Sequence, residues 1–236
     1  MIYVTSDLHG YPLDSFKRFL ERVGFCDDDF LFVLGDVIDR NGDGGVMLLQ
    51  WMMMQPNVEL ILGNHEAMLL ACNLFFEEIT EENIALLDEV QSQAWMDWVF
   101  NGAEPTLKAL SELRKKDIQM LHDLVDYIRE APLYDTVYAG ERDFLLVHSG
   151  LNHFEKHKAL SAYDPNDLLW HRPAPDERYF EDVLTILGHT PTAFYGSPHR
   201  MYRTPTWIDI DTGAGSGYAP MLLRLDDLHP FYIEQQ

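Results

Sequence analysis

Cysteine and basic residues are both scarce in this sequence. Cys26 and Cys72 are the only cysteines among 236 residues, so the sequence offers no disulfide framework and favours a reducing compartment. Seventeen Lys and Arg stand against 39 Asp and Glu, which gives a formal net charge of −22. Because phosphate backbones and anionic lipids attract positive charge, we expect neither general nucleic-acid binding nor a membrane partner.

Long apolar runs are also missing. Stretches such as VMLLQWMMM (46–54) and AMLLAC (67–72) are far shorter than the roughly 20 residues that cross a bilayer. The opening residues, MIYVTSDLHG, contain neither a basic stretch nor the cleavage site of a signal peptide. These features predict a cytoplasmic protein. The 47% apolar and 12% aromatic residues that are present predict a globular domain with a large buried core.

The first third of the chain alternates between strand-like and helix-like segments. Residues 2–6, 30–35 and 58–63 are short β-rich runs, and residues 13–24 and 45–54 between them have helical periodicity. This alternation predicts βαβ units and a sheet with parallel strands. Since open α/β sheets bind their ligands at the carboxyl ends of strands, the polar residues that follow these runs are candidate site residues.

The pattern changes over residues 77–131. Residues 77–90 and 110–131 are charged, and each predicts a continuous helix, with a turn-like NGAEP (101–105) between them. We interpret 77–131 as a helical insertion in one domain that covers residues 1–236. Beyond it, residues 134–140 and 142–150 predict a hairpin around Gly140, and three later segments are strand-like: 183–190, 206–213 and 219–227.

Five of the strand-like runs end in polar side chains that can bind metal. These residues are Asp7 and His9, Asp36 and Asp39, Asn64 and His65, His148, and His189. Each cluster alone could be structural, but burying so many carboxylates together without cations would be very costly. Because side chains alternate along an extended strand, we expect Asp7 and His9 to leave the chain on the same face. The pattern predicts a two-metal cluster at one edge of the sheet.

The polar clusters lie in the motifs DLHG, GDVIDR, GNHE, VHSG and GHT, and the chain later contains DIDTGAGSGY (209–218). These motifs resemble those of the calcineurin-like metallophosphoesterases, and among them the phosphoprotein phosphatases of bacteria and phages. They occur in the family's order, and residues 209–218 are similar to its closing segment. The resemblance covers nearly the whole chain. It implies an α/β fold with a β-sandwich of mixed sheets flanked by helices.

The resemblance also implies a ligand set for two divalent or trivalent metal ions, with Asp36 shared between them. The first ion takes Asp7, His9 and Asp36, and the second takes Asp36, Asn64, His148 and His189. Such donors suit Mn best in our interpretation, with Fe or Zn as alternatives. The reaction implied is in-line attack of an activated water on phosphorus.

Four further residues match catalytic roles in the family. His65 matches the general acid, Asp39 its orienting partner and Arg40 a phosphate-binding arginine. Arg172, in Trp170-His171-Arg172, matches a second phosphate clamp more loosely, with a surface arginine as the alternative.

Other positions near these motifs are given structural roles. Asn41 replaces the family's usual glycine, and we expect it to adopt the left-handed backbone conformation that Asn tolerates. Glu66 is expected to support the ligands or the start of a helix. Trp95, Trp98 and Phe100, just before NGAEP, are expected to pack in the core.

The leading hypothesis for function is a serine/threonine protein phosphatase acting on phosphoproteins. A symmetrical diadenosine-tetraphosphate hydrolase, or another hydrolase of small phosphoesters or nucleotides, is the alternative, because these enzymes share the same motifs. A metal-free interaction module is the non-enzyme alternative, and the intact set of six ligands argues against it. The sequence leaves the oligomeric state and the natural substrate open.

Overall fold

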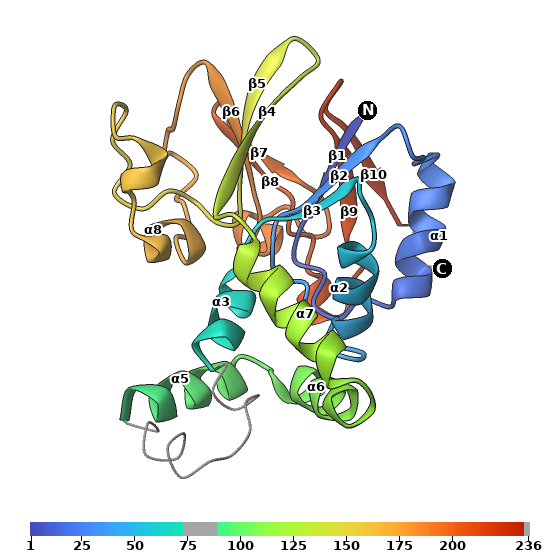
Figure 1. Ribbon diagram of the computed structural model, residues 1–236. Helices are drawn as coiled ribbons and strands as arrows, with labels where there is room; N and C mark the ends of the chain where they lie inside the picture. The colour runs from blue at the N-terminus through green and yellow to red at the C-terminus, as the bar shows by residue number, and fades with distance from the viewer. Residues whose placement is uncertain (73–88, 234–236) are drawn as a thin grey trace.

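A computed structural model describes residues 1–72 and 89–233 of the chain (Figure 1). Most of the helix predicted at 77–90 therefore lies outside the described residues.

Two five-stranded mixed sheets form the centre of the molecule. In spatial order, the first sheet consists of β10 (His229–Tyr232), β9 (Met221–Arg224), β1 (Ile2–Thr5), β2 (Phe30–Val33) and β3 (Val58–Leu60). The second consists of β4 (Tyr134–Ala139), β5 (Arg142–Val147), β6 (Val183–Leu187), β8 (Trp207–Asp209) and β7 (Tyr202–Arg203). Strands β1, β2 and β3 are mutually parallel, as are β5, β6 and β8. The antiparallel pairs are β9 with β1, β10 with β9, β4 with β5, and β7 with β8.

Alternation along the strands explains why the two sheets pack face to face. In β1, Val4 faces the other sheet while Tyr3 faces the helices. In β5, Phe144 likewise faces the other sheet and Leu145 faces outward. The residues between the sheets form one apolar cluster drawn from both of them. The predicted sandwich of mixed sheets is confirmed.

Helices cover the outer faces of the sandwich (Figure 1). Helices α1 (Leu13–Val23) and α2 (Val46–Met53) pack on the first sheet through residues such as Phe16 and Leu49. The short helix α8 (Pro165–Leu169) packs through Leu168 on the outer face of the second sheet, together with the 3₁₀ turn at Leu160–Ala162. No described helix is long and apolar enough to cross a membrane.

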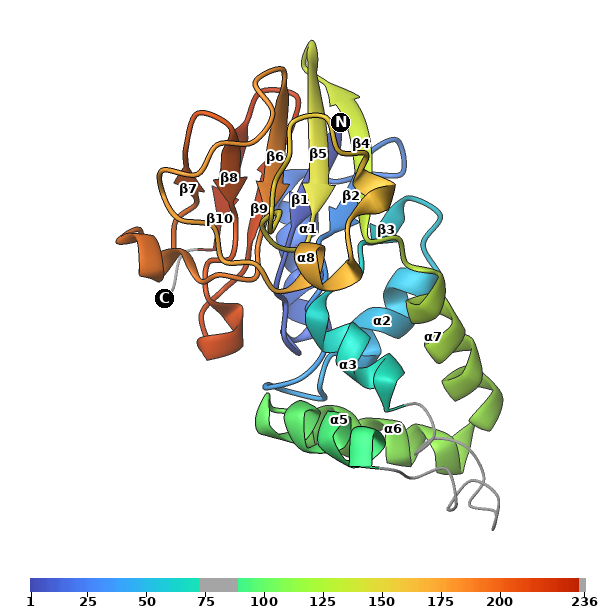
Figure 2. The same ribbon diagram turned by 90° about the vertical axis from the view of Figure 1, so that its left-hand side faces the viewer.

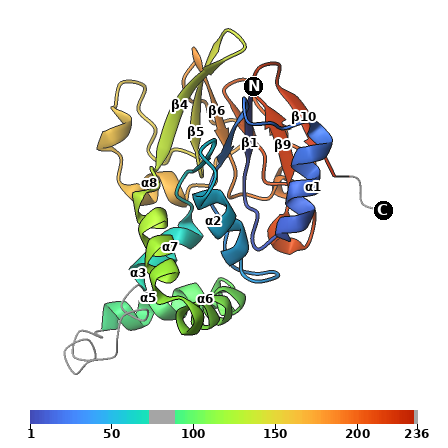
Figure 3. The ribbon, with the colours of Figure 1, turned by 45° about the vertical axis from the view of Figure 1, so that its right-hand side comes forward.

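Four more helices gather at one end of the sheets, below the strands in Figures 2 and 3. They are α3 (Asn64–Ala71), α5 (Glu89–Phe100), α6 (Glu104–Lys116) and α7 (Ile118–Glu130). The turn predicted at NGAEP is present, because α5 ends at Phe100 and α6 begins at Glu104. The continuous helix predicted over 110–131 is wrong: it breaks at Asp117, whose side chain accepts a hydrogen bond from the Met120 N–H and caps α7.

The predicted strands run one to four residues past the observed strand ends. The chain leaves the sheet at these points because the loops that carry the polar clusters begin there. The carboxyl ends of six parallel strands, β1, β2, β3, β5, β6 and β8, meet at this edge, which places the candidate site residues together. Strands β7 and β10, both at the sheet margins, were not predicted from the sequence.

Candidate metal centre

The loops that follow the strands hold their residues in an uncommon backbone conformation. Ten described non-glycine residues have positive φ, and six of these are predicted site residues: Asp7, His9, Asp36, Asp39, Arg40 and His189. Such conformations cost roughly 1–3 kcal/mol each and concentrate at functional sites, where the surrounding structure enforces them. The strained backbone is thus evidence for a functional site, and this evidence does not depend on the residue types.

Asp7 and His9 do not leave an extended strand as predicted. β1 ends at Thr5, and both residues are left-handed, with φ of 53° and 41°. The N–H groups of Asp7 and His9 donate to the carbonyls of Gly35 and Asp36, so this loop is bound to the one that follows β2. Both side chains nevertheless reach the site, because the two loops run together.

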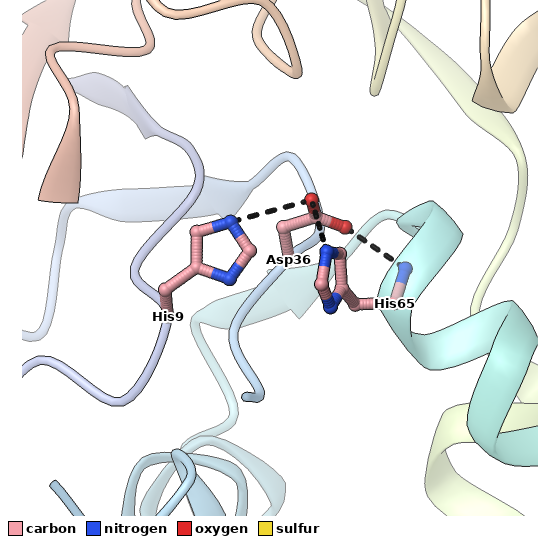
Figure 4. A group of neighbouring side chains, drawn as sticks. All are labelled: His9, Asp36 and His65. Carbon is pink, nitrogen blue, oxygen red and sulfur yellow. Dashed lines mark hydrogen bonds and ion pairs between the residues drawn. The ribbon is translucent and has the colours of Figure 1, made fainter. Parts of the chain in front are cut away.

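The first candidate metal group contains His9, Asp36 and His65 (Figure 4). Asp36 Oδ2 lies 3.5 Å from His9 Nε2 and 3.8 Å from His65 Nε2. The other oxygen, Oδ1, accepts the backbone N–H of His65 at 3.1 Å. All three side chains are buried, and their candidate ligand atoms lie within 4.8 Å of one another.

The second candidate group contains Asp36, His148 and His189, with Asn64 between them. His148 Nε2 lies 3.4 Å from Asp36 Oδ1 and 2.8 Å from Asn64 Oδ1. His189 Nδ1 lies 2.9 Å from the same amide oxygen. Asp36 therefore belongs to both groups, as expected of a shared ligand.

Asp7 stands beside these groups and belongs to neither. Its Oδ2 accepts the backbone N–H of His189 at 2.9 Å, which ties the end of β1 to the loop after β6. Burial raises the pKa of Asp36, and the nearby carboxylate of Asp7 raises it further.

The hydrogen bonds of the histidines fit a metal centre. His9 Nδ1 donates to the Ile38 carbonyl at 2.9 Å, and His148 Nδ1 donates to the Leu34 carbonyl at 2.7 Å. A neutral imidazole carries one N–H, so each ring turns a bare Nε2 towards Asp36. Lone pairs of imidazole, carboxylate and amide oxygen thus converge on the same space, an arrangement that a cation stabilises.

The electrostatics point the same way. Burial, followed by repulsion from Asp211, raises the pKa of Asp7 well above its usual range, and burial and then Asp7 do the same for Asp36. Burial lowers the pKa of His148 to about 3 and that of His189 to about 2, so both rings are neutral. Uncharged imidazoles beside crowded carboxylates are ready to bind cations, which would supply the missing positive charge.

His65 sits at the start of α3 and is held at both ring nitrogens. Its Nδ1 lies 2.6 Å from Asp39 Oδ2, and both side chains are almost completely buried. Its Nε2 lies 3.2 Å from Nη2 of Arg40, which is exposed. The predicted acid, its partner and the predicted phosphate-binding arginine therefore lie together beside Asp36.

Arg172 lies next to His189 of the second candidate group. Its Nη1 donates to the backbone carbonyl of His189 at 3.4 Å, and its guanidinium lies 5.8 Å from the ring centre of Phe194. The Trp170 ring lies 6.0 Å from the His189 ring. Arg172 is thus an exposed residue in contact with the second metal group.

Glu66 fastens the loop that carries Asp36. Its buried carboxylate accepts the backbone N–H groups of Asp36 at 2.8 Å, Val37 at 2.8 Å, Ile38 at 3.2 Å and Gly63 at 3.2 Å. Burial raises the pKa of Glu66, and the hydrogen bonds from this loop oppose the rise. Glu66 therefore has the supporting role expected of it.

Replacing Glu66 by Ala should destabilise the protein strongly. Four buried N–H groups would lose their acceptor, and since an unpaired buried donor costs roughly 1–3 kcal/mol, the free energy of unfolding should fall by at least about 3 kcal/mol. Glu66→Gln, which keeps one acceptor oxygen, should lose less. Urea unfolding of the metal-free protein measures both. The exposed Glu112→Ala is the control, and an equal midpoint for Glu66→Ala and Glu112→Ala would contradict this role.

Asn41 does not adopt the left-handed conformation predicted for it. The left-handed non-glycine residues around it are Asp39 and Arg40. The Asn41 amide instead donates to the carbonyls of His9 and Ala214, at 3.0 Å each. It thereby joins the loop after β1 to the 3₁₀ turn at Ala214–Ser216.

Three residues near the centre were missed as site residues. Trp98, predicted to be core, is fully buried but also donates its indole N–H to Asp39 at 2.8 Å, while Phe100 of the same helix is exposed rather than core. Thr106 donates to Asp39 at 2.6 Å. Asp211 is buried after β8 with its pKa raised by burial to about 6. The signal of a polar residue after a strand could have identified Asp211.

Curated relatives of the chain are symmetrical bis(5'-nucleosyl)-tetraphosphatases. One from Acidovorax sp. strain JS42 is 26% identical over 151 residues, which is 64% of this chain and 44% of that protein. One from Actinobacillus succinogenes is 34% identical over 153 residues, again 64% of this chain and 44% of that protein. The chain thus matches less than half the length of these relatives.

Solved structures share the fold over nearly the whole chain. The cold-active protein-tyrosine phosphatase of a Shewanella species has a TM-score of 0.58 and 16% identity, covering 99% of this chain and 80% of that one. The family model described as calcineurin-like phosphoesterase matches residues 1–212, a range that includes all the candidate metal ligands. The chain belongs to the calcineurin-like phosphoesterase family.

Proposed function

We propose that this chain is a metal-dependent phosphatase that hydrolyses phosphoserine and phosphothreonine in proteins, with residues 1–236 forming one catalytic domain that contains the helical insertion. One observation carries the proposal. The His65–Asp39 pair, joined at 2.6 Å, is buried beside Asp36, which both candidate metal groups share.

The leaving group determines how much this pair can contribute to hydrolysis. Hydrolysis of a phosphoserine or phosphothreonine ester expels an alkoxide, which is a strong base, so a well-placed general acid speeds the reaction greatly. Cleavage of a phosphoanhydride expels a nucleoside polyphosphate, a much weaker base that needs little protonation. A buried and firmly held acid therefore contributes most to hydrolysis of an alkyl phosphoester, which is the substrate class that we propose.

Each residue then has a defined task. In the proposal, the first metal is held by Asp7, His9 and Asp36, and the second by Asp36, Asn64, His148 and His189. Two such ions, with Mn the preferred pair and Fe or Zn as alternatives, would lower the pKa of a water molecule and offset the charge of the phosphoryl group. Arg40 and Arg172 bind the phosphoryl oxygens. His65 donates the proton from Nε2 to the leaving oxygen, and Asp39 stabilises the imidazolium.

Symmetrical hydrolysis of dinucleoside tetraphosphates is the second candidate. The names of the curated relatives favour it. Trp170 and Phe194, 41% and 76% exposed beside Arg172, also offer aromatic surfaces on which a base could stack.

A turnover panel on the Mn-loaded protein separates the two. It should contain phosphoserine and phosphothreonine peptides, diadenosine tetraphosphate, a mononucleotide and an aryl phosphate. We expect the highest kcat/KM on a phosphopeptide. A higher kcat/KM on diadenosine tetraphosphate than on every phosphopeptide would favour the second candidate.

Both arginines should contribute to catalysis, and Arg40 should contribute more. Its guanidinium lies next to His65 and its backbone N–H is fixed by the Gly102 carbonyl at 2.9 Å. Within the described part of the chain, the side chain of Arg172 makes one hydrogen bond, 3.4 Å long, to the His189 carbonyl. Loss of one such charge-stabilising donor costs roughly 10²–10³ in kcat, which we expect for Arg40→Ala. Arg172→Ala should lose less.

Arg178→Ala is the matched control, because Arg178 is exposed on the same loop and, among the described residues, bonds only to local carbonyls. Steady-state kinetics on a phosphoserine peptide gives kcat/KM for all three variants. If Arg172→Ala behaves like Arg178→Ala, the second phosphate clamp has been assigned to the wrong residue.

The net charge of −22 should select among substrates that approach from solution. A phosphosite flanked by Lys or Arg should have a higher kcat/KM than the same site flanked by Asp or Glu, because the outer field attracts the basic peptide. High salt should narrow the difference. The measurement uses two peptides that differ only in flanking charge, at low and high ionic strength, and a preference for the acidic peptide would contradict it.

A further inference from the structure

The carboxylate of Asp39 is held by the helical insertion. Its Oδ1 accepts the Thr106 hydroxyl at 2.6 Å, and its Oδ2 accepts the Trp98 indole N–H at 2.8 Å and the His65 Nδ1–H at 2.6 Å. Among the described residues, these three supply every hydrogen bond to the carboxylate. Two of the three donors therefore come from α5 and α6, outside the sandwich that carries the metal groups.

The same segment fixes the backbone of the dyad. The Asp39 N–H donates to Thr106 Oγ1 at 3.0 Å, and the Arg40 N–H donates to the carbonyl of Gly102, in the turn between α5 and α6. Trp98, Thr106 and Asp39 are each fully buried, so water does not replace these bonds. Figure 2 shows α5 and α6 beneath α3, the helix that begins with Asn64 and His65.

We propose that Trp98 and Thr106 are positioning residues for the general acid, so that the helical insertion sets how well His65 protonates the leaving group. This inference rests on the proposed acid role of His65. The torsion that orients an Asp carboxylate has a broad energy profile, so the group needs external donors to stay aimed. With both oxygens held, Asp39 keeps the Nδ1–H of His65 in line and presents Nε2 to the substrate.

Three substitutions test the proposal. Trp98→Phe removes the N–H and keeps an aromatic ring, Thr106→Val removes the hydroxyl with little change in shape, and Thr106→Ser keeps the hydroxyl. Trp51→Phe is the matched control, because Trp51, on α2, packs edge-on against Phe16 of α1. Metal content and thermal unfolding of each variant are recorded first.

We expect Trp98→Phe and Thr106→Val to lower kcat on a phosphoserine peptide by roughly 10–100-fold, the usual effect of losing an outer hydrogen-bond partner. KM and metal content should stay near those of the wild type. The loss should be much smaller on 4-nitrophenyl phosphate, whose leaving group needs little protonation. Thr106→Ser should restore most of the activity, and Trp51→Phe should lose none.

A double-mutant cycle gives the decisive comparison. In a His65→Asn background, Trp98→Phe and Thr106→Val should have almost no further effect on kcat, because the group that they position is gone. Equal losses of kcat on the peptide and on 4-nitrophenyl phosphate would overturn the proposal. So would a double variant whose loss of kcat equals the product of the losses in the two single variants. If Trp98→Phe fails to fold, the Thr106→Val and Thr106→Ser pair decides alone.

Failure of the proposed function has a different signature. In that case the kcat of His65→Asn itself falls by the same factor on the peptide and on the aryl phosphate. If His65→Asn loses activity selectively while the Trp98 and Thr106 variants keep full kcat, only the positioning role is wrong.

Discussion

His65→Asn should reduce turnover of a phosphoserine peptide by roughly 10²–10⁴, the usual contribution of a general acid, while both metals stay bound. The asparagine cannot carry a proton to the leaving oxygen. The ring that it replaces is 1% exposed, bonded to Asp39 at 2.6 Å and 3.8 Å from Asp36 Oδ2, so it lies beside the candidate metals.

Substrate dependence is the internal control for this variant. The loss should shrink on an aryl phosphate, and Asp39→Asn should reproduce part of the loss on the peptide. Because His65 also lies within 4.8 Å of the other ligand atoms of the first group, metal content must be measured in the same samples. Loss of a metal from His65→Asn, or an equal loss of activity on both substrates, would contradict the acid role.

Asp36→Asn should lower metal content and activity together. Asp36 is the one side chain common to both candidate groups, at 3.5 Å from His9 and 3.4 Å from His148. An amide presents one oxygen instead of two and no charge, so both ions should bind more weakly. The loss of activity should exceed the roughly 10–100-fold that removal of an outer partner costs.

The stability of Asp36→Asn provides a control, because the substitution should not lower stability although it lowers activity. Burial and then Asp7 raise the pKa of Asp36 in the folded protein, so the native state binds this proton more tightly than the unfolded state. The contribution of Asp36 to stability therefore falls as pH rises through the raised folded-state value. Metal-free Asp36→Asn should be at least as stable as the metal-free wild type at pH 7. Elemental analysis and thermal unfolding test both points, and an Asp36→Asn protein with full metal content would contradict a shared ligand.

The part of the fold that was predicted correctly rests on local signals. The segments that form β1, β2 and β3 alternate with helical segments in the sequence. This alternation predicts parallel strands whose carboxyl ends lie at one edge of the sheet, as they do. The hairpin around Gly140 was predicted because strand-like runs flank a turn residue, and β4 and β5 pair on either side of it. The assignment of Asp36 to two metals came from the family's motifs and remains a prediction.

The details that were not predicted depend on contacts between distant residues. Two of the donors to Asp39, Trp98 and Thr106, stand 59 and 67 positions further along the chain, and nothing in the local pattern pairs them with it. Trp98 looked like a core residue because a tryptophan ring is mostly apolar, although its buried N–H required an acceptor. Asp7 and His9 seemed to continue a strand, yet bonds to the next loop turn their backbone. The break at Asp117 had a local signal, an N-capping residue after three basic residues, that the continuous run of charged residues obscured.

The most direct measurement is a titration of the metal-free protein with Mn²⁺, in which bound metal and phosphoserine-peptide turnover are followed in the same samples. Turnover should remain low through the first equivalent, rise with the second and reach a plateau at two ions per chain, because the nucleophile and the shared Asp36 need both. Full turnover with one ion bound, or with none, would contradict a two-metal phosphatase.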